Sequence, residues 1–226
     1  MAFDNFLKLM DNLLSEGGCP WDREQTHESL RQYLLEECYE TIEAINKRDM
    51  DSLKEELGDM LLQVVFHAKL AEKAGVFTME DVIKGVCNKL ISRHTHVFGV
   101  DKATSAADVI QVWEANKQKE RRHSPKDAMQ AVPKALPALV RAAKILKRSP
   151  AGMPTNDDLY NDIHDKLNCL KEADEQCFED FGKLLLSLVS VSVILDINAE
   201  FSLTNAVEGF INTVIAKPPV KSGLYD

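Results

Sequence analysis

Apolar residues along the chain recur mostly at three- and four-residue steps, which is the spacing of one face of an α-helix. They mark one long helix from His27 to Asn46 and a second from Met50 to Ala74. Asp49 or Asp51 is the expected N-cap of the second helix, because a short side-chain oxygen can bind the free N–H groups there. Gly75 is its expected stop.

Two further helices are expected in the same half of the chain. One runs from about Thr78 to Arg93, where Thr78 and Asp81 have the spacing of a capping box. The other begins near Ser105 and ends in the charged run from Lys117 to Arg122. Because no stretch shows sustained period-two alternation, the sequence predicts an all-α fold.

The composition changes between Ser124 and Asp158, where five of the eight prolines fall. A short basic amphipathic helix is predicted within this stretch, around Leu139 to Leu146. Proline interrupts helices, so the stretch is predicted to connect two helical units. The expected domains are a catalytic unit over residues 1–123, a connector over 124–157 and a second unit over 158–226.

The two halves share an internal repeat. Glu55 to Val65 align with Glu179 to Val189, and the alignment continues without a gap as far as Leu90 and Val214. Its apolar and glycine positions are kept, but Asp180 replaces Glu56 and Lys183 replaces Asp59. The sequence therefore predicts two tandem copies of one helical-bundle module, the first active and the second degenerate and retained for packing.

Acidic residues gather in two short runs of the first copy, one on each of its first two long helices: Glu36, Glu37, Glu40, Glu55, Glu56 and Asp59. Residues three or four apart share a helix face, so Glu37 pairs with Glu40 and Glu56 with Asp59. If the helices pack antiparallel, the two pairs converge, and a hard divalent cation such as Mg²⁺ would relieve their repulsion. Such a site suits phosphate-anhydride chemistry, while a solvated acidic face is the alternative that spacing alone leaves open.

The composition narrows the range of partners and locations. The net charge of −9 and the pI of about 5.2 argue against polymeric nucleic acid, which needs a basic surface. Five scattered cysteines without a CxxC pair suit reduced thiols, and the N-terminus lacks the basic region of a signal peptide. The apolar stretch from Leu184 to Leu195 is too short to span a bilayer and is predicted to be a buried helix. We therefore expect a cytoplasmic protein without a membrane partner.

A series of motifs then points to a known family. Gly18 to Leu30 reads GCPWDREQTHESL, and LLEECYE, EELGD, RHTHVFG and W-E-x-x-K follow it in order. Together these motifs resemble the MazG family of nucleoside triphosphate pyrophosphohydrolases, from Met1 to about Arg122. The second half resembles the family's second repeat only in its apolar positions.

The resemblance implies an all-α module that works as a homodimer and uses Mg²⁺, with Mn²⁺ as a substitute. A metal-activated water would attack between the α and β phosphates of a nucleoside triphosphate and release pyrophosphate. The implied ligands, with two close neighbours after them, are Glu37, Glu40, Glu56 and Asp59, then Glu36 and Glu55. Glu36 is a candidate general base, although the resemblance leaves that role unassigned.

The resemblance also implies a set of substrate contacts. Lys89 and Arg93 would face the triphosphate, Trp113 would stack on a base and Lys117 would reach a phosphate. The sequence departs from the family pattern at Thr95, where the family usually has proline.

Several alternatives stay open at this point. One is a sister enzyme that prefers a single deoxyuridine or deoxycytidine triphosphate; others are a non-catalytic nucleotide sensor and a structural helical adaptor. His94 and His96 form an H-x-H motif that could hold zinc. Trp21 is expected to be a core residue and His67 a core histidine, while His27 is expected to contact its loop or the site.

Overall fold

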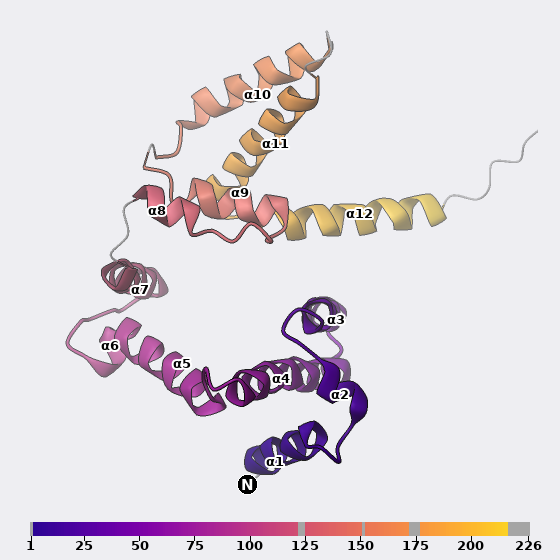
Figure 1. Ribbon diagram of the computed structural model, residues 1–226. Helices are drawn as coiled ribbons and strands as arrows, with labels where there is room; N and C mark the ends of the chain where they lie inside the picture. The colour runs from indigo at the N-terminus through magenta and orange to yellow at the C-terminus, as the bar shows by residue number, and fades with distance from the viewer. Residues whose placement is uncertain (1, 122–124, 151, 172–176, 217–226) are drawn as a thin grey trace, which may run out of the picture. The chain divides into compact units, whose positions relative to one another are not determined.

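A computed structural model describes residues 2–121, 125–150, 152–171 and 177–216, and all elements in these ranges are helices (Figure 1). The predicted all-α class is therefore confirmed. The chain divides into two compact units, Met1–Lys117 and Gln118–Asp226. The first unit contains α1 (Ala2–Leu14), α2 (Pro20–Glu24), α3 (Leu30–Lys47), α4 (Met50–Lys73), α5 (Met79–Arg93), α6 (Thr95–Phe98) and most of α7 (Ala106–Arg121), whose residues 118–121 fall in the second unit. The second contains α8 (Pro125–Gln130), α9 (Ala138–Leu146), α10 (Asn156–Lys171), α11 (Cys177–Ile194) and α12 (Ala199–Ala216).

Helix α4 is the centre of the first unit, because it packs against α1, α3 and α5. Its apolar side contributes Val65, Phe66 and Ala68 to a buried cluster with Met10 of α1 and Leu30 of α3. Burial of this cluster is the main driving force that holds the helices together.

The helix limits follow local chemistry closely. Asp49 is the N-cap of α4, and its carboxylate accepts from the N–H groups of Asp51 and Ser52, each at 3.1 Å. Gly75 follows α4 at φ +69°, a backbone conformation that glycine adopts readily. The capping box of Thr78 and Asp81 opens α5 as expected.

The start of α3 differs from the expected boundary, and the expected end of the fourth helix lies outside the residues that the structure describes. Helix α3 begins at Leu30 rather than at His27, because Thr26 and Ser29 form a turn before it. In that turn the Thr26 N–H donates to Ser29 Oγ at 3.0 Å, and the Ser29 N–H to Thr26 Oγ1 at 3.1 Å. At the end of the fourth predicted helix, Arg122 lies outside the described residues.

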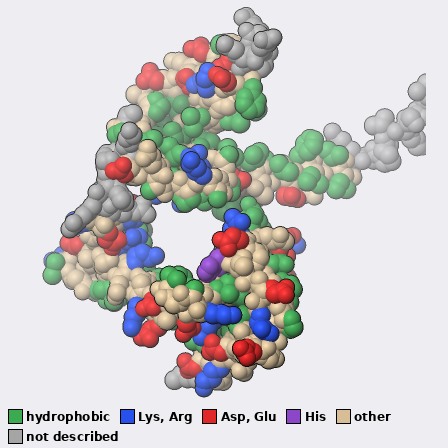
Figure 2. All heavy atoms as spheres, in the orientation of Figure 1, with side chains coloured by type: hydrophobic (Ala, Val, Ile, Leu, Met, Phe, Trp, Pro, Cys, Tyr) green, Lys and Arg blue, Asp and Glu red, His purple; other side chains and the backbone are tan. Residues whose placement is uncertain are grey.

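In the second unit, α10 packs against α11, and α9 packs against both α11 and α12. The predicted basic helix is present as α9. Leu184 and Val189 of α11 are buried, whereas Leu186 is 46% exposed, so the predicted buried helix is buried on one side only. Figure 2 shows apolar side chains on the surface of α12. The exposed apolar residues of this helix include Phe201, Leu203, Val207 and Phe210.

Among the described helices, none by itself has the length and apolar character needed to cross a membrane. The bent pair Phe178–Ile194 and Ala199–Ile215 meets those two criteria only when both helices are taken together.

At two positions of the second unit, opposite charges replace the like charges of the aligned positions in the first unit. Lys183 donates to Asp180 at 2.8 Å, at the positions aligned with Asp59 and Glu56. Nearby, Asp162 accepts from Lys166 and from Ser187, and these bonds hold the pKa of Asp162 below its usual value. In these two pairs an acidic and a basic side chain neutralise each other. The predicted tandem repeat and domain limits stay predictions.

Candidate metal centre

Three carboxylates converge between α3 and α4. One oxygen each of Glu37, Glu56 and Asp59 lies within 4.8 Å of the other two, and all three side chains are half-buried. The helices bring them together because only Arg48 and Asp49 separate α3 from α4. Arg48 adopts a left-handed conformation (φ +57°) and so reverses the chain tightly. Of the two acidic pairs that the sequence places on separate helices, Glu37 therefore meets Glu56 and Asp59, whereas Glu40 is exposed and lies outside this group of three.

The electrostatics of this cluster are those of carboxylates that repel one another. Burial raises the pKa of Glu37, and the charges of Asp59, Glu40 and Glu56 raise it further. Burial likewise raises the pKa of Glu56, followed by the charges of Glu40, Asp59 and Glu55. Among the residues that the structure describes, Glu37, Glu56 and Asp59 form no ion pair with a basic side chain. A bound cation would supply the missing positive charge.

The donor set fits a hard divalent cation. Three carboxylates offer only oxygen ligands, which Mg²⁺, Mn²⁺ and Ca²⁺ prefer, whereas zinc sites usually contain histidine or cysteine. Within the described ranges, no third ligand accompanies His94 and His96, so the H-x-H motif forms no such group there. Glu36 and Glu55 are both exposed and do not belong to this group of three, and Glu36 accepts a hydrogen bond from Gln32 at 3.4 Å.

The predicted basic and aromatic residues form a second group at the end of α5. The Arg93 guanidinium lies 5.3 Å from the centre of the Trp113 ring, and His94 meets the same ring edge-on at 4.8 Å. Lys117 pairs with Glu114, and Lys89 is exposed. In Figure 1, α5 leads away from α3. Within one chain, the structure thus brings the acidic residues together but does not place the basic group beside them.

Thr95, the departure from the family pattern, connects α6 to α7. Its hydroxyl donates to Asp101 at 2.6 Å and accepts from Asn116 at 2.7 Å. A proline has no hydroxyl and could make neither bond. The Thr95 hydroxyl therefore links α6 to Asn116 of α7, the helix that carries Trp113.

Two histidines that the sequence treats separately are in contact. Nδ1 of His27 lies 2.8 Å from Nδ1 of His67, and the rings are nearly parallel. Close by, Trp21 meets Tyr33 edge-on but is 51% exposed, so the expectation that Trp21 is a core residue is wrong.

This histidine pair predicts a pH dependence of stability. Burial, and then the neighbouring His27, hold the pKa of His67 below its ordinary value of about 6.5. The folded state therefore binds this proton more weakly than the unfolded state. The resulting stability is present above about pH 6.5 and is lost as the pH falls through the lowered pKa. We expect the melting temperature of a His67→Gln variant to fall less than that of the wild type between pH 7 and pH 5.

Thermal melts over a pH series check this expectation. His164→Gln is the matched control, because His164 is an exposed histidine on α10. Parallel curves for wild type and His67→Gln would contradict the assignment.

One buried polar residue was not singled out by the sequence analysis. Gln63 of α4 is only 6% exposed, and its side-chain Oε1 has no hydrogen-bond partner among the described residues. The available signal was its spacing, since Gln63 lies four residues after Asp59 and four before His67.

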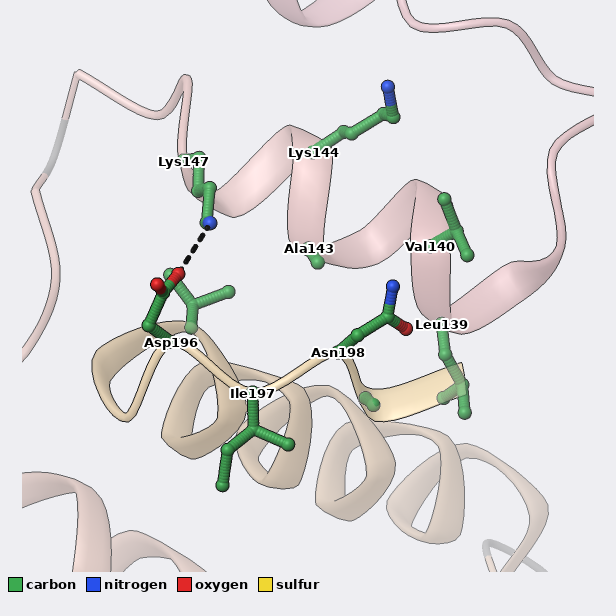
Figure 3. Close-up of a pocket in the computed structure, with 10 residues that line it drawn as sticks. Leu139, Val140, Ala143, Lys144, Lys147, Asp196, Ile197 and Asn198 are labelled. Atoms are coloured by element: carbon green, nitrogen blue, oxygen red, sulfur yellow. Dashed lines mark ion pairs between the residues drawn. The ribbon is translucent and has the colours of Figure 1, made fainter. Parts of the chain in front are cut away.

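A separate cavity of about 300 Å³ lies in the second unit, between α9 and the α11–α12 turn (Figure 3). Lys147 reaches across it to Asp196 at 3.5 Å. The cavity contains none of the predicted site residues, so it adds nothing to the acidic centre.

Comparison with known proteins places the acidic centre inside a conserved domain. The profile of the MazG nucleotide pyrophosphohydrolase domain matches residues 25–98, which include α3, α4 and α5. The chain is 42% identical to the nucleoside triphosphate pyrophosphohydrolase/pyrophosphatase MazG of Thermotoga maritima, over 93% of this chain and 83% of that protein.

Other relatives carry a similar name. The nucleoside triphosphate pyrophosphohydrolase of Escherichia coli K12 is 37% identical over 92% of this chain and 83% of its own length. That of Mycolicibacterium smegmatis is 38% identical over 91% of this chain and 56% of its own length. These matches extend well beyond the domain profile and into the second unit.

Proposed function

Because the chain belongs to the MazG nucleotide pyrophosphohydrolase family, we propose that it hydrolyses nucleoside triphosphates to nucleoside monophosphates and pyrophosphate. The observation that carries this proposal is the convergence of Glu37, Glu56 and Asp59 inside the domain match. A cluster of half-buried carboxylates without basic partners is costly to keep, and a metal-dependent reaction on phosphates gives it a use.

In this proposal Glu37, Glu40, Glu56 and Asp59 hold Mg²⁺, and Mn²⁺ can replace it. When bound, the cation lowers the pKa of a water molecule and offsets the charge that develops on the phosphates. By holding the cation, the carboxylates would orient its bound water toward the α phosphate. The exposed Glu36 is the proposed acceptor of its proton.

The substrate contacts are proposed from the second group of residues. Arg93 suits bidentate contact with phosphate oxygens, and Lys89 and Lys117 suit point-charge contact. Trp113 is the proposed platform for the base, and the exposed Glu55 is a further proposed substrate contact. Since α5 leads away from α3, we propose that these residues reach the triphosphate across a homodimer.

The exposed apolar faces of the first unit support that dimer. Leu57, Leu61 and Val64 follow one side of α4, with exposures of 54%, 40% and 39%. Helix α5 adds Val86 and Leu90, each 41% exposed. A contiguous apolar surface of this kind marks a protein interface. A second copy of the chain, which carries the same faces, is the proposed partner.

The second unit has a proposed supporting role. Its Asp180–Lys183 pair replaces two acids of the metal site, so we propose that this unit binds no Mg²⁺ and serves packing or shields the site. The free thiols of Cys19, Cys38, Cys87 and Cys169 support a cytoplasmic location, which is also part of the proposal.

A substrate panel tests the function. The protein is incubated with canonical ribo- and deoxyribonucleoside triphosphates and Mg²⁺, and products are separated by ion-exchange chromatography. We expect monophosphate plus pyrophosphate, and no product when the metal is chelated. Diphosphate plus inorganic phosphate would show that a different bond is cut. Metal-dependent binding without turnover would instead make the protein a nucleotide sensor.

A further inference from the structure

Gln63, which lies on α4 about one helical turn after Asp59, has an unusual feature. Its side chain is more than nine-tenths buried, yet its Oε1 accepts no hydrogen bond from any described residue. An unpartnered acceptor in a protein interior is unfavourable, so such an atom calls for a partner that is not part of the chain. The question is which donor the site can supply.

Position on the helix indicates the donor. Glu56, Asp59, Gln63 and His67 follow one another at three- and four-residue steps, so they share one side of α4. On that side, Glu56 and Asp59 meet Glu37 of α3. The backbone of Gln63 is about 6 Å further along the helix than that of Asp59, from the rise of 1.5 Å per residue.

A divalent cation at the carboxylates would bring suitable donors. Mg²⁺ usually keeps several of its waters, and the protons of those waters need acceptors beyond the ligands themselves. The next residue on this side, His67, directs its Nδ1 to His27, and the Gln63 oxygen accepts no hydrogen bond from it or from any other described residue.

We propose that Gln63 is a positioning residue whose amide oxygen accepts a hydrogen bond from a water molecule held by the divalent cation of the carboxylate cluster. The inference rests on the metal site of the proposed function and adds a residue to it. Gln63 thereby orients the hydration shell and strengthens metal binding without touching the metal.

Metal binding in the absence of nucleotide tests the proposal directly. Mn²⁺ titrations by electron paramagnetic resonance compare wild type with Gln63→Met, which keeps the length of the side chain but removes the acceptor. We expect the Mn²⁺ half-saturation to rise by about tenfold or more, the usual effect of removing an outer-shell partner. The melting temperature of metal-free Gln63→Met should be unchanged or higher, because an unpartnered acceptor is lost. Gln63→Glu, which retains an acceptor oxygen, should restore metal binding.

Gln111→Met is the matched control, because Gln111 is an exposed glutamine on α7. The proposal is overturned if Gln63→Met binds Mn²⁺ as tightly as wild type. It is also overturned if Gln63→Met loses stability without metal, since Gln63 would then have a structural partner such as a buried water. A wild type that binds Mn²⁺ but shows no turnover contradicts only the proposed function. A wild type that binds no Mn²⁺ contradicts both.

Discussion

Replacement of Glu37 by glutamine is expected to abolish metal-dependent turnover and, at the same time, to raise the melting temperature of the metal-free protein. Glu37 faces Glu56 and Asp59, and burial together with these charges raises its pKa. An amide removes one of the repelling charges and so favours the metal-free fold. The same change removes a proposed ligand, and we expect turnover to fall by more than about 100-fold, since loss of outer-shell partners alone costs 10–100-fold.

Steady-state assays and thermal melts with and without Mg²⁺ measure both effects. Glu43→Gln is the control on the same helix, because Glu43 is exposed and pairs with Lys47 instead of joining the cluster. It should leave turnover unchanged. Two results would show that Glu37 does not belong to a metal site. One is full activity of Glu37→Gln. The other is a melting temperature of metal-free Glu37→Gln that is no higher than that of Glu43→Gln.

The second large effect is expected at the apolar face of α4. Val64→Asp should convert a dimer into a monomer, because a charge placed in an apolar interface loses its hydration without gaining a partner. Val64 is 39% exposed in the single chain, so the helix itself should survive the change. If the basic group of one chain serves the acidic cluster of the other, the monomer should also lose turnover.

Light scattering measures the oligomeric state, circular dichroism the helix content and the pyrophosphate assay the turnover. Val100→Asp is the control, since Val100 is 95% exposed and lies outside the apolar face. A wild type that is already monomeric, or a Val64→Asp monomer with full activity, would contradict the shared site.

A mixing experiment sharpens the same prediction. Glu37→Gln and Arg93→Ala should each be inactive alone, yet together form hybrid dimers in which one of the two sites is intact. Random pairing of two chains in a symmetric dimer would restore about a quarter of wild-type turnover. No recovery on mixing, despite exchange of subunits, would place both residues in the site of one chain.

Much of the local structure was accessible from the sequence because its causes are local. The apolar period, the Asp49 cap, the capping box of Thr78 and Asp81 and the stop at Gly75 all act within a few residues. The same reasoning located the acidic pairs, since residues three or four apart share a helix face. Where a side-chain turn competed with the helix, at Thr26 to Ser29, the expected boundary of α3 was three residues early.

The remaining features depend on which face of each helix is covered by other helices. The apolar period of a single helix does not predict which face that is. The sequence alone determined that the chain is helical and that Glu37, Glu56 and Asp59 lie near the apolar sides of their helices. Only the tertiary structure decided that these three carboxylates meet, that Trp21 stays exposed and that the buried Gln63 oxygen has no partner in the described part of the chain. It also decided that α5, which ends at Arg93, leads away from the acidic cluster. The direction of a helix after a turn is set by packing between distant segments.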